Sequence, residues 1–492
     1  MGRLTSLVGI FVLMGIAYLL SNNRKAIDWK LVGAGVGLQF VFAVLVLKTK
    51  AGQAFFAYMN DVIVALLGFT DRGSEFIFGY IVMDPAKYGE FVFAVKVLPT
   101  IIFFSALMSL LYYVGVMQFV VEIIAKLMVR LLGTSGAETL SASANIFIGQ
   151  TEAPLLIKPY VEKMTRSELM VVMTGGFATV AGGVMAAYVA LLRDQFPGIA
   201  GHLMAASLMS APAALVMAKI LIPETEEPMT KGDVKIDVPQ TDANAIEAAA
   251  NGASTGLQLA LNVGAMLLAF IALINMFDAG LNLLLGHWIP GISFSMIFSY
   301  LFAPIALVMG VPWQDALVVG ELLGKKLIIN EFVAYLDLAN ILKGDHPISG
   351  RSTVILTYAL CGFANFSSIG IQIGGIGGIA PSRKGDLARL GVIAVIGGTL
   401  ACFQTATIAG ALIDESEIQL VRPAPTASPT PEATPPQSES PTPEAPATPL
   451  ESPTPEASRH SSLCICETNV LASYGRIVSY REGTSGPHLT YI

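Results

Sequence analysis

Two short polar segments, each carrying a carboxylate, interrupt apolar sequence of membrane-spanning length. The first is residues 145–154, Asn-Ile-Phe-Ile-Gly-Gln-Thr-Glu-Ala-Pro, which contains Glu152, and the second is the pair Asn330-Glu331. A carboxylate at bilayer depth costs several kcal/mol unless it meets a partner, water or a cation. The glycine and proline beside Glu152 argue against one regular helix. Interrupted backbone with a carboxylate therefore predicts a solute or ion site inside a membrane protein.

Gln150, Thr151 and Glu152 present three different hydrogen-bonding groups in consecutive positions. The Gln150 amide both donates and accepts, Thr151 adds a hydroxyl, and Glu152 adds acceptor oxygens. Because the edge of a nucleobase also alternates donors and acceptors, this cluster indicates a base-binding site. Two simpler explanations stay open: the Gln-Thr pair caps a half-helix, and Glu152 balances a helix dipole at its N-terminus.

Glu331 and Asn365 suit a ligand with neighbouring hydroxyl groups. A carboxylate can accept two O–H bonds from a vicinal diol such as that of ribose. Ser368 lies three residues after Asn365, on the same face if this stretch is helical, and Phe363 could pack on an apolar ring face of the ligand. The alternatives are an ordinary core aromatic for Phe363 and a backbone hydrogen bond within the broken helix for Ser368.

A cation site is predicted beside the first polar segment. Asn145 and Thr179 offer oxygen ligands in two adjacent interrupted segments, and unwound carbonyls, for example those of Ile148 and Val180, could complete a hard-cation site. No thiolate or imidazole is nearby in the sequence to favour a transition metal, so sodium fits. The alternative is that Asn145 and Thr179 bond only to orphan backbone groups. No other cofactor is expected.

The composition is that of a polytopic membrane protein. Of the 492 residues, 54% are hydrophobic and 13% are charged, against about 25% charged in a soluble domain. No basic patch indicates a nucleic-acid partner, and no Gly-x-x-x-x-Gly-Lys-Ser/Thr loop supports direct drive by ATP. The net charge of −7 arises partly from the C-terminal tail.

We predict an all-α fold with eight transmembrane helices, because eight segments are apolar over about 20 residues, the length that spans a bilayer. Residues 51–82 are apolar but carry charges, which suits a helix at the interface. Segments 138–164 and 313–342 are interrupted by the two polar islands, which predicts two re-entrant helical hairpins. The predicted transmembrane segments are residues 6–20, 31–47, 91–117, 168–192, 202–222, 256–285, 353–379 and 390–413.

Each predicted hairpin is followed by a transmembrane segment that is itself interrupted, at residues 179–183 and at residues 362–370. Two corresponding pairs of interrupted segments are typical of an inverted-repeat transporter. A Pro-, Thr- and Glu-rich tail, too polar to bury a core, ends the chain. The predicted parts are N-terminal and interfacial scaffold helices 1–137, first transport repeat 138–223, acidic loop 224–255, scaffold segment 256–312, second transport repeat 313–380, last transmembrane helix 381–415 and disordered tail 416–492.

Three motifs, at residues 149–160, 330–335 and 362–370, closely resemble those of the concentrative nucleoside transporters, and the resemblance runs from about Thr5 to Ile413. It implies a homotrimer of independently working protomers, each with a trimerisation scaffold and an inverted-repeat transport domain. Thr179 stands where the family pattern has Ser, which keeps the hydroxyl. The residues that the resemblance assigns are Gln150, Thr151 and Glu152 for the base, Glu331, Asn365 and Ser368 for the ribose, Val184 and Phe363 for the pocket lining, and Asn145, Ile148, Thr179 and Val180 for sodium.

These residues and the resemblance together predict a sodium-coupled nucleoside symporter of a bacterial inner membrane, working by alternating access. Its partners would be a nucleoside, sodium and the lipid bilayer. Proton coupling is the alternative, because Glu152 or Glu331 could titrate. An intramembrane enzyme is disfavoured, since no nucleophile–base set or metal triad accompanies the two carboxylates. Uphill accumulation would distinguish the symporter from a passive pore, because a pore cannot concentrate its solute.

Overall fold

The computed structural model describes residues 2–79, 93–231, 242–415, 418, 420 and 421. Their regular structure is helical, apart from one isolated β-bridge between Ser135 and Lys231. Residues Met1–Thr426 form one compact unit. The second unit, Ala427–Ile492, lies outside the described residues, and so does nearly all of the predicted tail 416–492. The division of residues 1–415 into scaffold and transport parts stays a prediction.

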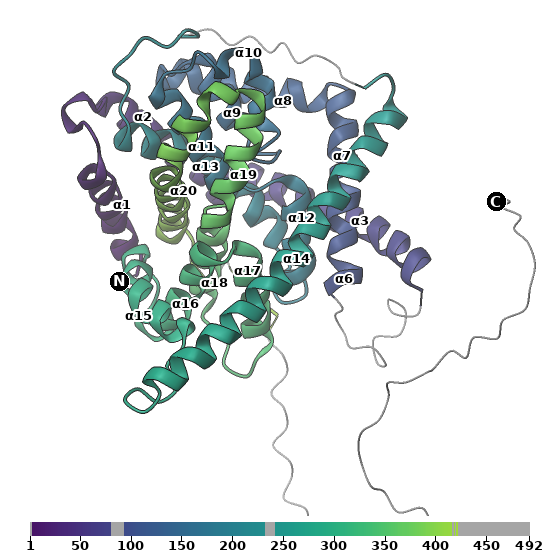
Figure 1. Ribbon diagram of the computed structural model, residues 1–492, viewed down its shortest axis with the longest axis vertical. Coiled ribbons are helices and arrows are strands. Elements are labelled where there is room, and N and C mark those ends of the chain that lie inside the picture. The colour runs from purple at the N-terminus through teal and green to yellow at the C-terminus, as the bar shows by residue number, and fades with distance from the viewer. Residues whose placement is uncertain (1, 80–92, 232–241, 416–417, 419, 422–492) are drawn as a thin grey trace, which may run out of the picture. The chain divides into compact units, whose positions relative to one another are not determined.

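Figure 1 shows the arrangement of the helices. In chain order they are α1 (Gly2–Leu20), η1 (Arg24–Ala26), α2 (Trp29–Lys48), α3 (Lys50–Phe78), α6 (Phe93–Lys96), α7 (Leu98–Tyr113), α8 (Val116–Leu132), α9 (Gly136–Ala144), η2 (Ala153–Ile157), α10 (Lys158–Val161), α11 (Arg166–Ala178), α12 (Gly182–Leu192), α13 (Ile199–Leu221), α14 (Ala245–Leu285), α15 (Phe294–Met309), η3 (Trp313–Asp315), α16 (Ala316–Ile328), α17 (Glu331–Lys343), α18 (Gly350–Leu360), α19 (Phe366–Ile379), η4 (Pro381–Arg383) and α20 (Lys384–Leu412).

Within the described part of the chain, eight segments are long and apolar enough to cross a membrane. Seven of them overlap predicted transmembrane segments. The eighth is α3, which was expected at the interface and has the lowest mean hydropathy of the set, 1.3. The predicted segment 353–379 is instead divided into α18 and α19, and neither helix is long enough to cross a membrane by itself. The interfacial position of α3 stays a prediction.

The helices differ widely in how far they are buried within the protein. In an apolar 18-residue stretch of each span, 89% of the residues are buried in Ile199–Leu221 and 83% in Pro381–Leu412, against only 11% in Ala245–Leu285. Small residues let helix backbones approach closely without a hydrophobic drive from water. On α20, for example, Gly398 faces the side chain of Phe177, leaving no room for a Cβ atom. The helices α11, α13, α18 and α20 therefore pack together as a core.

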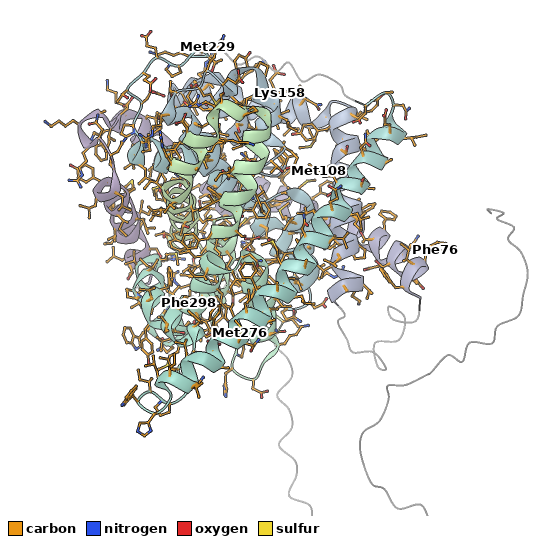
Figure 2. The ribbon with its side chains drawn as sticks, in the orientation of Figure 1. Phe76, Met108, Lys158, Met229, Met276 and Phe298 are labelled. Carbon is orange, nitrogen blue, oxygen red and sulfur yellow. The ribbon has the colours of Figure 1, made fainter. Side chains whose placement is uncertain are left out.

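The long helix α14 packs against α7, and most of its remaining surface is apolar and exposed. Figure 2 shows Met276 on α14 and Phe76 on α3, and their side chains are 57% and 92% exposed. Exposed apolar side chains over a membrane-length helix suit contact with lipid or with another helix.

The first hairpin is held at its base by two capping boxes, in which a hydroxyl and a glutamate each satisfy a backbone N–H group at a helix start. Ser135 and Glu138 form the box of α9, and Thr165 and Glu168 form that of α11. The Ser135 hydroxyl also donates to the Glu168 carboxylate at 2.5 Å, and Lys219 Nζ lies 2.8 Å from Glu138. The helices α9 and α11 therefore begin side by side.

The first broken helix is interrupted within the expected residues 179–183, whereas the second break is shorter than the expected 362–370, because α19 already begins at Phe366. α11 ends at Ala178 and α12 begins at Gly182, while α18 ends at Leu360 and α19 begins at Phe366. Gly362 adopts a φ of +145°, and a Cβ atom there would lie 2.7 Å from the Phe177 carbonyl oxygen, so only glycine fits. The Phe363 N–H donates to the Thr179 carbonyl at 3.3 Å. The two interruptions therefore meet.

Candidate functional site

Glu331 is the first residue of α17, at the turn of the second hairpin. The preceding Asn330 caps the helix by accepting the Val333 N–H at 3.0 Å. Glu331 is only 4% exposed, and its two carboxylate oxygens accept the Tyr188 hydroxyl at 3.0 Å and the Asn365 amide at 2.9 Å. Because an ionised carboxylate has about four acceptor positions, these two donors leave acceptor capacity for a ligand.

Asn365 is fixed from both ends of its amide. Its Oδ1 atom accepts the Ser368 N–H at 2.9 Å and the Ser367 hydroxyl at 2.7 Å, which caps α19. Its Nδ2 atom is thereby turned toward Glu331. Ser368 is 2% exposed, one turn along the same helix face as Asn365. The structure thus brings together Glu331, Asn365 and the start of α19, as the sequence predicts.

Tyr188 on α12 was not among the predicted residues. It lies 143 residues before Glu331 and is held by ring contacts to α17, stacked on Tyr335 with ring centroids 4.3 Å apart and edge-on to Phe332 at 5.1 Å. Aromatic pairs of this kind add stability beyond their buried area. In an apolar helix a tyrosine is typical of an ordinary core residue. Its hydrogen bond to the Glu331 carboxylate could therefore be found only from the tertiary structure.

Gln150 lies in the turn after α9 and is 7% exposed. Its side-chain oxygen accepts the Gln372 amide at 2.9 Å, and the same Gln372 nitrogen donates to the Met173 carbonyl at 3.0 Å. The sequence prediction omitted Gln372. One signal could have found it: Gln372 follows Ser368 by four residues, so the two share a face of α19.

One helix, α19, therefore contacts both carboxylate-bearing hairpins. Its cap Asn365 holds Glu331, and Gln372 holds Gln150. These two positions are seven residues apart in sequence, which corresponds to about 10 Å along a helix. The two polar islands thus converge along one helix.

Thr151 and Glu152 are half-buried beside this helix. A Cβ atom at Gly375 would lie 2.7 Å from Thr151 Cγ2, so α19 passes close to this turn, and Gly149 faces the Glu152 carboxylate. The Oε2 atom of Glu152 is buried and has no hydrogen-bond partner among the residues that the structure describes. A buried acceptor of this kind invites a donor from a ligand.

Val184 and Phe363 flank the two helix interruptions. Val184 is 2% exposed near the start of α12, and Phe363 is half-buried between α18 and α19. Their predicted role in lining a pocket stays a prediction.

The predicted cation residues lie where the first hairpin meets the broken helix α11. Asn145 is fully buried, and within the described chain neither its Oδ1 nor its Nδ2 atom has a hydrogen-bond partner. The Gly175 backbone in the last turn of α11 adjoins this amide, since a Cβ atom there would lie 3.5 Å from Asn145 Nδ2. An orphan buried amide oxygen beside a helix C-terminus suits a hard cation.

Thr179, Val180 and Ile148 surround the same junction. Thr179 donates its hydroxyl hydrogen to the Gly175 carbonyl at 2.8 Å, which leaves the oxygen lone pairs of that hydroxyl for another partner. Val180 is fully buried in the interruption. The Gly182 N–H donates to the Phe147 carbonyl at 3.0 Å, and this bond joins the interruption to the turn that contains Ile148. The oxygen-rich junction fits sodium.

Comparison with known proteins covers almost all of the membrane part of the chain. Family models described as Na+ dependent nucleoside transporter N-terminus, nucleoside recognition, and Na+ dependent nucleoside transporter C-terminus match residues 8–81, 94–195 and 202–410. An uncharacterized transporter of Haemophilus influenzae is 46% identical over 84% of this chain and 98% of its own length. Sodium/nucleoside cotransporter 1 of mouse is 43% identical, over 83% of this chain and 64% of its own length.

Solved structures of one protein, CNTnw, are similar to this chain in inward-facing, outward-facing and intermediate states. The inward-facing, substrate-bound structure has a TM-score of 0.78 and 43% identity, covering 84% of this chain and 98% of that one. An outward-facing structure of a CNTnw variant has a TM-score of 0.78 and 42% identity over the same shares.

Proposed function

Because the chain belongs to the family of Na+-dependent nucleoside transporters, we propose that it imports nucleosides together with sodium by alternating access. The family and the helical membrane architecture agree with the resemblance of the three motifs and with the predicted fold class. We further propose the direction of transport, the coupling ion and the roles of individual residues.

The observation that supports the substrate site most strongly is the buried Glu331 carboxylate. Its partners Tyr188 and Asn365 are neutral donors, so its charge and part of its acceptor capacity are available to a ligand. The ribose hydroxyls would donate to this carboxylate, with Asn365 and Ser368 beside them. A nucleoside is uncharged, so binding leaves one net negative charge on this group.

The base would lie toward the first hairpin. Gln150, held by Gln372, keeps its amide nitrogen as a donor, while Thr151 and Glu152 add a hydroxyl and acceptor oxygens. Val184 and Phe363 would pack against the apolar ring faces of the nucleoside. The convergence of both hairpins along α19 supports one shared site.

Sodium would bind between the buried Asn145 amide and the C-terminus of α11, with Thr179 and the carbonyls of Ile148 and Val180. Moving one charge inward gains about 2.3 kcal/mol per 100 mV of membrane potential, which is roughly a fifty-fold accumulation at about 1.4 kcal/mol per factor of ten. One sodium ion can therefore concentrate an uncharged solute.

The two hairpins and the two broken helices would move as the transport domain. The inward- and outward-facing states of CNTnw support alternating access for this chain. We also propose a homotrimer in a bacterial inner membrane, for which the exposed apolar face of α14 offers contact surface. Transport without chemical change of the substrate is expected.

The test is uridine uptake into proteoliposomes containing the purified protein. We expect uptake to require an inward sodium gradient and to be stimulated by an inside-negative potential. Proton coupling is the second candidate, because the buried Glu331 and the half-buried Glu152 could carry a proton. Uptake that persists in sodium-free buffer but stops when the pH gradient collapses would reject sodium coupling. Recovery of unchanged uridine from the lumen would exclude an enzymatic reaction.

A further inference from the structure

Lys326 on α16 is a buried cation that the proposed site does not use. Its side chain is among the largest that are fully buried, with an exposed fraction of 1%. Its Nζ atom donates to the Ala359 carbonyl oxygen at 2.7 Å, and it forms no ion pair with any of the residues that the structure describes. A buried ammonium is costly unless something in the fold requires its charge.

The adjacent Lys325 behaves differently. Its Nζ atom forms ion pairs with Asp337 at 2.6 Å and Glu321 at 2.7 Å, and these side chains are partly exposed. Successive positions on a helix point about 100° apart, so Lys325 faces the second half of its own hairpin while Lys326 faces α18. Lys325 is therefore ion-paired with two carboxylates, whereas Lys326 forms no ion pair within the described part of the chain.

The position of Lys326 corresponds to that of the proposed sodium site. Each transport repeat consists of a hairpin followed by a broken helix, so α9 corresponds to α16 and α11 corresponds to α18. In the first repeat, Asn145 at the end of α9 adjoins Gly175 in the last turn of α11. In the second, Lys326 in the last turn of α16 bonds to Ala359 in the last turn of α18.

Both junctions favour a positive charge. At each one, two half-helices end together, and the carbonyl ends of helices carry partial negative charge. At the first junction the side chain is a neutral amide, so the positive charge must come from an ion. At the second it is an ammonium covalently attached to the chain.

We propose that the Lys326 ammonium acts as a built-in cation, occupying in the second repeat the place that the coupling ion takes in the first. The protein would then bind one sodium ion per nucleoside. Lys326 also belongs to the hairpin that carries the buried Glu331, a carboxylate whose hydrogen-bond donors, Tyr188 and Asn365, are neutral. This inference rests on the proposed sodium-coupled function.

The stoichiometry of the wild-type protein is the first test. In proteoliposomes with a fixed sodium gradient, the membrane potential at which net uridine flux is zero reports the number of sodium ions moved with each nucleoside. We expect one. Two or more would refute the inference, and this measurement needs no substitution. Uridine uptake that is independent of sodium would instead refute the proposed function.

The second test compares Lys326→Met with two matched variants, Lys326→Arg and Lys325→Met. In Lys326→Met an external cation must replace the lost charge, so the sodium dependence of uridine binding should steepen toward a Hill coefficient of about 2. The sodium concentration at half-saturation should rise about tenfold or more, the effect of losing one favourable charge interaction. Lys326→Arg and Lys325→Met should keep the wild-type sodium curve.

A wild-type sodium curve in folded Lys326→Met protein would refute the inference. So would an Arg variant that behaves like the Met variant, because the proposal depends on charge rather than on shape. Elution as the wild-type oligomer and an unfolding midpoint measured for each variant establish that folded proteins are being compared.

Discussion

Replacing Glu331 by Gln should greatly weaken nucleoside binding while leaving the fold intact. The Asn365 amide cannot turn, because its oxygen is held by Ser368 and Ser367, so the oxygen of the introduced amide would accept from Asn365. The new NH2 group would then face the Tyr188 oxygen, and the Tyr188 hydroxyl can rotate to accept that bond. The buried hydrogen bonds are therefore preserved, and the change is confined to charge and acceptor capacity.

The magnitude follows from the ribose hydroxyls. A hydrogen bond to a charged group contributes about 1.5–3 kcal/mol, against about 0.5–1.5 kcal/mol for a neutral one. The Gln amide oxygen, already bonded to Asn365, keeps one acceptor position, so the two ribose bonds together lose at least about 2–3 kcal/mol, which is about 30- to 150-fold or more in affinity. The dissociation constant of uridine, measured by calorimetry at saturating sodium, checks this value.

The substrate 2′,3′-dideoxyuridine provides the control, since it lacks both hydroxyls that would contact Glu331. It should bind weakly to the wild-type protein, and Glu331→Gln should change its affinity by less than about threefold, because no interaction remains to be lost. An equal loss for uridine and the dideoxy analogue would refute the assignment of Glu331 to the ribose. Wild-type affinity for uridine in the variant would do the same.

Three further substitutions test other parts of the site. Gln372→Leu leaves the Gln150 oxygen without its donor and should weaken uridine binding about tenfold, with an unchanged sodium requirement. An altered sodium curve would contradict the separation of the base site from the sodium site. Asn145→Ala should raise the sodium concentration at half-saturation about tenfold or more, and uridine affinity should recover at high sodium, so an unchanged curve would argue against the cation site. Gly362→Ala should lower the unfolding midpoint, because an alanine at this positive φ and beside the neighbouring carbonyl costs about 1–3 kcal/mol. Gly370→Ala is the control and should leave the midpoint unchanged, because its Cβ would meet open space.

The polar islands and the helix interruptions were predictable because their signals are local. A carboxylate in an apolar run, with glycine or proline beside it, is unfavourable for a plain membrane helix whatever the rest of the chain does. The residues Asn145, Gln150, Glu331 and Asn365 could therefore be named from sequence, and the structure brings Asn365 to Glu331. Hydropathy alone could not separate α3 from a spanning helix, because its length and mean hydropathy also meet the criteria for one.

Other contacts depend on which helix faces are buried against each other. Tyr188 and Glu331 are 143 residues apart, and Gln372 and Gln150 are 222 apart, so no local pattern links them. The sequence shows Lys325 and Lys326 as two equivalent neighbours, yet one is paired near the surface and the other is buried against α18. The sequence alone determined a helical membrane transporter with two polar hairpin tips, since composition and interruption are properties of short segments. The tertiary structure decided which donors reach each carboxylate and which lysine is buried, because those outcomes follow from helix packing between distant segments.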